Sequence, residues 1–397
     1  MSNKQRNGLT IIMLLLLAAS AFVAGYFTNG IITSRNGSAH AQEQFDVFWE
    51  AWGRIENNFI GDLPDDSQRT YGAIRGSMQA LNDPYTVFIE PVARQREREQ
   101  LEGIFGGIGA YVSRPEDGGP IVLEPIPGNP AEAAGILVGD ILQAVDGMAI
   151  TAEMTVADVA DLVKGEKGTA VVLTILHSGE TEAVEISVIR GDILIPSVVY
   201  RLLEEDQSIG YIRLSRFSGE SGEEVADAIR DLQDQNAERF ILDLRQNRGG
   251  LLDAAIDITD HFLNEGPIAF QQSKEEGERA FNATSVTLAE DAPLVVLIDG
   301  GSASASEIVA GALQDRERAT LIGAEPTFGK GSVQLVFDLS DGSSVHVTSA
   351  RWFTPGRTQL DGEGIPPDIL VELTQEALDN GRDEVLNRAI EHLREVE

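Results

Sequence analysis

The second half of the chain restricts the fold most, because short apolar runs alternate there with amphipathic helical patterns. The expected strands are 209–214, 239–244, 294–298 and 320–322, and the expected helices are 222–233, 251–263 and 306–314. Such alternation is typical of a mainly parallel sheet covered by helices. Asp341-Gly342 then lies between two further β-like runs, a pattern that indicates a hairpin. We therefore predict an α/β core over residues 192–397, ending in a charged helix at 377–396.

The first half divides into two further parts. Over 103–191, five or six short β-like runs are broken by Gly and Pro turns, with short helices at 131–134 and 156–163, which predicts a small β-rich module. Over 43–102, apolar or charged residues recur at helical spacing, which predicts a helical segment. The expected fold class is thus multidomain α+β, with a helical N-terminal segment, a β-rich module and an α/β core.

The N-terminus suggests export. Lys4 and Arg6 precede an apolar stretch at 9–27, close to the ~20 residues that span a bilayer. Residues 1–42 are therefore expected to form a membrane anchor or signal segment followed by a polar tether. Ala39-His40-Ala41 resembles a cleavage site but lies far from the apolar run. We expect an uncleaved anchor and an extracytoplasmic remainder, with a secreted chain as the alternative.

Composition excludes several classes of protein and site. The formal net charge of −34 leaves no broad basic surface for phosphates, so we expect no nucleic-acid partner. The chain has no cysteine, which rules out disulfides, thiol nucleophiles and cysteine metal sites.

A run of alternating serines and alanines carries the candidate chemistry. Ser302, Ser304 and Ser306 lie where the apolar run 293–298 stops and a helical pattern begins. Backbone N–H groups at a helix N-terminus can hold an oxyanion beside a nucleophile. Lys330 lies between two glycines, and a hydroxyl with a neutral amine suffices for acyl transfer. The pattern indicates a serine–lysine hydrolase, although a helix cap and an exposed loop would explain the same residues.

A glycine cluster at 106–109 precedes the first strand of the β-rich module. Its N–H groups could hold a carboxylate, and the next strand could offer an edge to an extended peptide. A tight turn is the alternative interpretation.

Eleven short segments, taken in order, resemble the carboxy-terminal processing peptidases, also called tail-specific proteases. The segments are 83–85, 106–109, 128–131, 134–135, 139–140, 209–212, 242–245, 249–250, 302–308, 327–334 and 364–368. The resemblance covers nearly all of the chain after the tether. It implies a PDZ domain at 103–191 that binds the C-terminal tail of a protein substrate, followed by a serine protease core at 192–397.

The resemblance also implies roles for individual residues. Peptide binding maps to the PDZ residues Gly107, Ile108, Gly109 and Ala110, with a groove between the strand 110–112 and the helix 131–135. The catalytic residues would be Ser304 as nucleophile, Lys330 as general base and Gln334 as the residue that orients the lysine; the oxyanion hole would use Ala305 and Gly249 or Gly250. Ser302 and Ser306 are the alternative nucleophiles. No metal and no cofactor are implied.

Gln334 follows Lys330 by four residues, a spacing that places both side chains on one face of a strand. Three positions depart from the family pattern. Ala324 is an extra residue before the lysine, Arg248 replaces a frequent proline before the paired glycines, and Lys164 replaces an arginine of the PDZ domain.

Three functions remain open on the sequence. The first is an active, anchored endopeptidase that acts on protein tails, with a homo-oligomer or an activator protein as possible partners. The second is a PDZ scaffold with a catalytically silent protease fold. The third is a ligand carrier on a related fold, which would not require the lysine.

Overall fold

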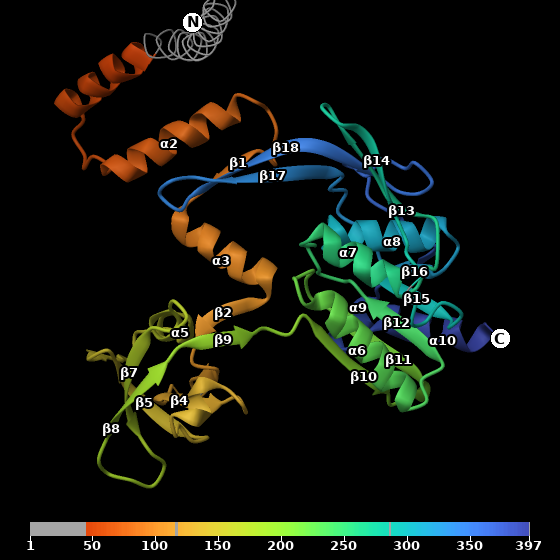
Figure 1. Cartoon of the computed structure of the whole chain (residues 1–397), viewed down its shortest axis with the longest axis horizontal. Coiled ribbons are helices and arrows are strands. Elements are labelled where there is room, and N and C mark those ends of the chain that lie inside the picture. Colours follow the sequence, from red (N-terminus) through yellow and green to blue (C-terminus); the bar gives the residue numbers. More distant parts are fainter. Residues whose placement is uncertain (1–44, 116–117, 286, 397) are drawn as a thin grey trace, which may run out of the picture. The chain divides into compact units, whose positions relative to one another are not determined.

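The computed structural model describes residues 45–115, 118–285 and 287–396 (Figure 1). The chain divides into two units, one ending at Ala73 and the other beginning at Ile74. Residues 45–58 are helical, and α2 (Asp66–Gln79) begins in the same unit. The expected anchor at 9–27 lies outside the described residues. Within the described part of the chain, none of the helices combines the length and the apolar character needed to span a membrane.

The β-rich module is built around an antiparallel sheet in the order β3-β4-β5-β7-β8, with β6 paired to β5. Its elements are β3 (Ala110–Ser113), β4 (Ile121–Pro125), α4 (Pro130–Ala133), β5 (Asp140–Val145), β6 (Met148–Ala149), α5 (Val156–Val163), β7 (Ala170–Leu176) and β8 (Val184–Ile189). Before and after this sheet, α3 (Pro91–Glu102) leads into β2 (Ile104–Gly107), which pairs with β9 (Gly191–Leu194).

The expected position of the groove beside β3 needs correction. The helix packed against β3 is α5, whereas α4 packs against β8. α4 has only four residues and is too short to line an extended peptide, while α5 has eight residues and buries Val159 and Val163.

The α/β core contains a sheet in the order β10-β11-β12-β15-β16-β19. β10 (Val198–Leu203) is antiparallel to β11 (Asp206–Leu214). The parallel strands that follow are β12 (Arg239–Asp243), β15 (Leu294–Ile298), β16 (Thr320–Gly323) and β19 (Ile369–Leu370). The predicted strands 239–244 and 294–298 coincide with β12 and β15.

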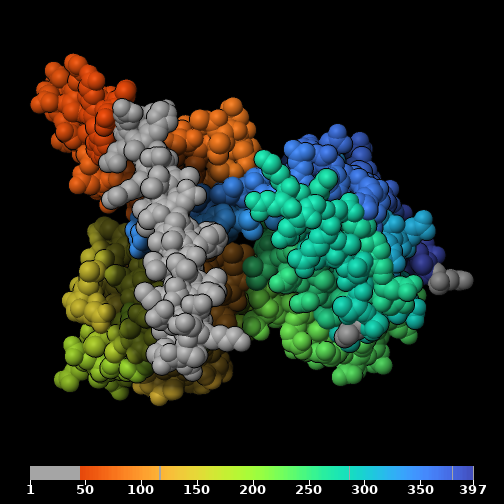
Figure 2. Space-filling view, turned by 45° about the horizontal axis from the view of Figure 1, so that its top comes forward, coloured from red at the N-terminus to blue at the C-terminus, as the bar shows by residue number. Residues whose placement is uncertain are grey.

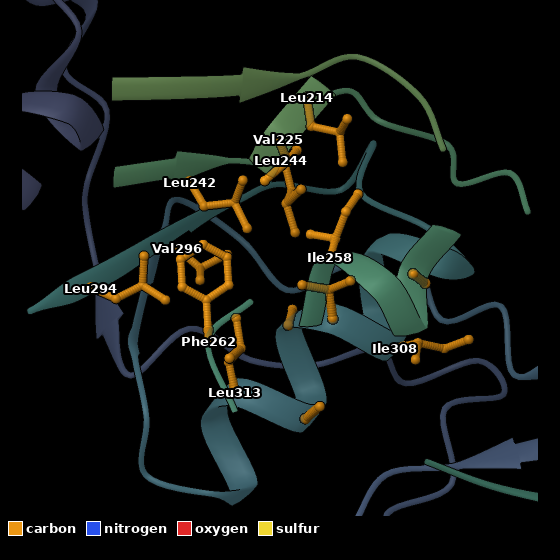
Figure 3. Close-up of a cluster of buried hydrophobic side chains, with 14 of the residues drawn as sticks. Leu214, Val225, Leu242, Leu244, Ile258, Phe262, Leu294, Val296, Ile308 and Leu313 are labelled. Atoms are coloured by element: carbon orange, nitrogen blue, oxygen red, sulfur yellow. The ribbon is translucent and has the colours of Figure 1, made fainter. Parts of the chain in front are cut away.

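Both faces of this sheet are covered by helices. On one face, strand residues such as Leu242 and Val296 pack against Ile258 and Phe262 near α7 and against α8 (Figure 3). The strand residues at the alternate positions, such as Ile241 and Val295, point to the opposite face and pack against α10. The helices are α6 (Ser221–Asp234), α7 (Leu252–Asp260), α8 (Ala305–Asp315) and α10 (Glu384–Glu395). Period-two alternation along each strand thus supplies two hydrophobic layers.

A second, antiparallel sheet has the order β1-β18-β13-β14, with β17 also paired to β18. The strands are β1 (Val87–Ile89), β13 (Pro267–Ser273), β14 (Gly277–Asn282), β17 (Ser332–Asp338) and β18 (Ser344–Phe353). β17 and β18 form the predicted hairpin. In the space-filling view, the green, teal and blue surfaces of the core adjoin one another, so segments distant in sequence share one body (Figure 2).

The predicted C-terminal helix at 377–396 is wrong in its extent. The segment forms two helices, α9 (Gln375–Asp379) and α10, separated by a turn in which Gly381 has φ +64°. Glycine adopts this conformation without the steric cost that other residues bear. The first helix therefore ends at Asp379, and α10 begins after Asp383. The Asp383 side chain caps α10 by accepting a hydrogen bond from Leu386 N–H.

Candidate active site

Ser304 lies in the connection from β15 to α8 and immediately precedes the helix. Its backbone has φ 57° and ψ −112°, a positive φ that is unusual for a residue with a side chain. Such a conformation costs about 1–3 kcal/mol and is retained only where the surroundings enforce it. The side chain is half-buried at the N-terminus of α8.

The neighbouring serines are fully buried and bound to backbone carbonyls. The Ser302 hydroxyl donates to Leu244 O at 2.8 Å, and the Ser306 hydroxyl donates to Asn247 O at 2.8 Å. Both side chains thereby fasten the connection to the loop after β12. Among the three candidates, this favours Ser304 as the reacting serine.

Lys330 precedes β17 and has a half-buried side chain. Burial lowers the pKa of its ammonium group from the usual 10.5, because a poorly solvated site disfavours the charged form. The negative charges of Glu307 and Glu97 act in the opposite direction and raise this pKa. Nζ lies 5.4 Å from the centre of the Tyr85 ring, a cation–π distance. Tyr85 belongs to the segment 83–85 that the sequence had singled out.

Glu307 joins the two candidate loops. It is fully buried in the first turn of α8. Its Oε2 accepts hydrogen bonds from the N–H groups of Ser304 (2.7 Å) and Lys330 (2.9 Å). Its Oε1 accepts from Thr327 Oγ1 (2.6 Å) and Gly329 N–H (2.7 Å). One carboxylate therefore holds the backbone of the candidate nucleophile and of the candidate base.

Sequence reasoning missed this role of Glu307. A signal was present, since an acidic residue three positions after a serine is the pattern of a capping box. That pattern explains the bond to Ser304 N–H but gives no indication of the three bonds to residues 327–330, which are about twenty residues away in sequence.

The candidate oxyanion loop approaches Ser304 closely. A Cβ atom placed on Gly249 would lie 2.9 Å from Ser304 Cβ and 2.9 Å from Ala305 N. However, the Gly249 N–H donates to Asn247 Oδ1 at 2.9 Å, so it is already engaged. Among the described residues, neither Gly250 N–H nor Ala305 N–H donates a hydrogen bond. Of the two predicted glycines, Gly250 is therefore the better candidate donor.

Among the described residues, the Gln334 amide binds partners other than Lys330. The Gln334 amide donates to Ser332 Oγ at 2.9 Å and to Thr348 Oγ1 at 3.4 Å. Lys330 lies before the first residue of β17, and the pairing with β18 shifts between Val333 and Gln334. Because Lys330 precedes the strand, the period-two alternation on which the expected common face depended does not extend to it. In the described part of the chain, the Lys330 side chain makes no hydrogen bond to Ser304 or to Gln334.

The candidate peptide-binding loop lies where β2 gives way to β3. Gly107, Ile108 and Gly109 are buried, and Ala110 begins β3. Gly109 has φ +72°, and an added Cβ would meet Asn129 Cβ at 2.3 Å, so glycine is required there. β3 is an edge strand of its sheet, and among the described strands it pairs with β4 alone. A free strand edge next to a glycine loop can accept an extended peptide.

Two of the residues that depart from the family pattern, Lys164 and Ala324, make contacts within their own part of the fold. Lys164 ends α5, where its Nζ lies 5.1 Å from the Phe105 ring centre and 4.0 Å from Asp161 Oδ1. Ala324 follows β16 and packs against the hydrophobic layer on the α10 side of the sheet. The described residues contain no group of three or more His, Asp or Glu side chains arranged to hold a metal ion.

Comparison with known proteins identifies the family. Residues 208–371 match peptidase family S41, and residues 121–176 match a PDZ domain. The chain is 36% identical over 362 residues to the carboxy-terminal-processing protease of Bartonella bacilliformis, covering 88% of this chain and 82% of that protein. This chain belongs to the carboxy-terminal-processing proteases. It is a serine peptidase of family S41.

Other members of this protease family are similar over most of the chain. The carboxyl-terminal-processing protease of Synechocystis is 38% identical over 324 residues, which cover 81% of this chain and 75% of that protein. Among solved structures, the photosystem II D1 C-terminal processing protease is 32% identical, with a TM-score of 0.47 over 81% of this chain and 86% of that chain.

Proposed function

We propose that this chain is an endopeptidase in which Ser304 is the nucleophile and Lys330 the general base, and that it selects proteins by their C-terminal tails. The observation that carries this proposal is the shared hydrogen-bond acceptor. Glu307 Oε2 binds the backbone N–H groups of both Ser304 and Lys330, so one buried carboxylate fixes the two loops beside each other. A silent scaffold would have no need for this arrangement or for a partly desolvated lysine.

The reaction would proceed in two halves. The Ser304 oxygen attacks the peptide carbonyl carbon while neutral Lys330 Nζ takes the hydroxyl proton. The N–H groups of Ala305 and Gly250 stabilise the oxyanion, and Lys330 then gives the proton to the leaving amine. Water attacks the acyl-enzyme with the same lysine as base, which releases the carboxylate product and restores Ser304. The long side chain of Lys330 permits the change of rotamer that would form its hydrogen bond to the Ser304 hydroxyl.

Tail recognition is assigned to the PDZ domain. The N–H groups of the loop 107–109 would bind the terminal carboxylate, and the edge of β3 would pair with the extended tail. The eight-residue α5 beside β3 supplies an apolar wall with Val159 and Val163 at its base. Selection of this kind requires a free carboxylate at the end of the substrate.

The test is cleavage of one unfolded protein with an apolar tail, prepared with either a free or an amidated C-terminus. The full-length enzyme, in detergent, should cleave the free form faster, and a serine-reactive fluorophosphonate should label Ser304 in wild type but not in Ser304→Ala. Equal cleavage of both forms would contradict tail recognition. Labelling at another serine would contradict the assigned nucleophile.

We further propose that the catalytic part functions outside the cytoplasm on an N-terminal anchor. Lys4, Arg6 and the apolar run 9–27 support this orientation. A C-terminal tag should be removed by protease added to intact spheroplasts. Protection of the tag until the membrane is broken would contradict the proposal.

Removing the charge of Glu97 should change the pH dependence of the reaction, because this charge raises the pKa of Lys330. Activity requires neutral Lys330, so kcat/KM should rise with pH through the lysine pKa, which burial places below its usual value. The charge of Glu97 raises this pKa, so Glu97→Gln should lower it and move the rising limb to lower pH. The measurement is the pH profile of kcat/KM, with Glu99→Gln on the same helix as the control. A shift toward higher pH would contradict the assignment.

The close approach of Gly249 predicts a second effect. In Gly249→Ala, the new methyl group would meet Ala303 O at 2.7 Å and Ser304 Cβ at 2.9 Å, at a position with φ +97°. Displacement of the oxyanion loop should reduce kcat by about 10²-fold, comparable to the loss of one oxyanion donor. Gly219→Ala serves as the control, since its Cβ would lie 3.5 Å from the nearest atom, Glu102 O. Similar kcat values for the two variants would show that the loop tolerates displacement.

A further inference from the structure

Two arginines that the reaction does not use border the hollows next to Ser304. Arg248 lines a cleft of about 640 Å³ together with Lys330 and Ala303, the neighbour of Ser304. Arg248 also lines an adjoining hollow together with Arg216 and Gly249. Arg248 therefore borders the space next to the reacting serine, and Arg216 borders the hollow that adjoins it.

Neither arginine is neutralised by a carboxylate. Within the described residues, Arg248 is exposed and makes no hydrogen bond or ion pair. Arg216 donates from Nη2 to Ile195 O (2.9 Å) and Pro196 O (3.0 Å), and its Nε is buried without a hydrogen-bond partner. The chain has 64 acidic and 30 basic residues, so acidic partners are abundant elsewhere. An arginine pair left without one in the cleft is available to a ligand.

The carboxylates that border the same space are already engaged. Glu97 Oε2 accepts from Arg94 at 2.9 Å and lies 3.2 Å from His346 Nε2. Glu325 accepts from Gly300 N–H at 3.0 Å. Within the described residues neither carboxylate pairs with Arg248, so a bound carboxylate would satisfy the fork of donors that its guanidinium presents.

We propose that Arg248, supported by Arg216, forms a subsite for an acidic side chain of the substrate, Asp or Glu, close to the bond that is cut. This inference rests on the proposed peptidase activity and names the substrates that it favours. Arg248 directly precedes Gly249, which approaches Ser304 within contact distance. Because an extended peptide advances about 3.3 Å per residue, the acidic residue belongs within about three positions of the scissile bond.

The test uses the full-length enzyme and peptides of equal length that carry Glu, Gln or Lys at each of three positions on either side of the cut. At one position, Glu should raise kcat/KM about tenfold over Gln, the size expected of a charge-assisted hydrogen bond. Arg248→Glu should reverse the preference so that Lys is favoured, which misfolding cannot produce. Arg248→Lys should keep a weaker preference for Glu, and Arg230→Glu, on the outer surface of α6, should leave the preference unchanged.

The outcomes separate this inference from the peptidase itself. Ser304-dependent cleavage with equal rates for Glu and Gln at every position would overturn the acidic subsite alone, as would a Glu preference that survives in Arg248→Glu. A preference that disappears when the peptide tails are amidated would assign the arginines to the terminal carboxylate and overturn the side-chain subsite. Absence of any Ser304-dependent cleavage would overturn both proposals.

Discussion

Replacement of Lys330 by alanine should lower kcat/KM by about 10⁴-fold or more, the loss typical of removing the base from a hydrolytic dyad or triad. The Glu307 carboxylate also lies beside Ser304, but it already accepts four hydrogen bonds and is not free to take the serine proton. Lys330→Arg should be equally inactive, because a guanidinium stays protonated and cannot take the serine proton. The double variant Lys330→Ala with Ser304→Ala should be no slower than either single variant, since the two groups act in one step.

The measurement is steady-state cleavage of a tail-bearing substrate, with circular dichroism to verify folding. Lys274→Ala, at an exposed lysine of the β13–β14 turn, is the matched control and should retain activity. If Lys330→Arg cleaved at more than a tenth of the wild-type rate, lysine would not be the base.

Glu307→Gln should reduce both activity and stability, although the side chain keeps its size. The carboxylate accepts four hydrogen bonds, two at each oxygen. In glutamine, one oxygen becomes an NH₂ group that faces two donors. Each buried donor left unsatisfied costs about 1–3 kcal/mol, so the free energy of unfolding should fall by about 2–6 kcal/mol. Loss of the bond to Ser304 or Lys330 should also lower kcat by at least about 10²-fold, because the reacting atoms are no longer held in place.

Denaturant unfolding and steady-state kinetics measure the two effects. Glu391→Gln, at an exposed position of α10, is the control and should change neither quantity. Wild-type activity in a destabilised Glu307→Gln would restrict Glu307 to a structural role. An unchanged free energy of unfolding in Glu307→Gln would contradict the stabilising role given to these hydrogen bonds.

Much of the fold follows from local patterns in the sequence. The strands β12 and β15 are apolar runs bounded by polar residues, and the predicted helix 156–163 coincides with α5. β1 escaped prediction because it has only three residues and depends on pairing with β18 more than 250 residues later. A strand this short has too little pattern to recognise and is held by a distant partner.

The candidate site likewise has residues that the sequence could predict and contacts that it could not. Ser304 and Lys330 lie in motifs whose composition could be recognised. The surroundings of Gln334 could not be predicted, since its amide donates to Thr348 on the neighbouring strand, a partner that only strand pairing brings near. The role of Glu307 depends on four hydrogen bonds, three of them to residues 327–330, and only folding brings these together.

The backbone of Ser304 has a consequence for how this enzyme responds to selection. A residue with φ 57° and ψ −112° destabilises the folded chain relative to glycine, which adopts positive φ freely. Stability therefore favours glycine at position 304, whereas turnover requires serine there. A library of variants screened for heat resistance alone would be expected to lose the serine and enrich glycine. A screen that also requires peptide hydrolysis would keep the serine and accumulate compensating substitutions at other positions.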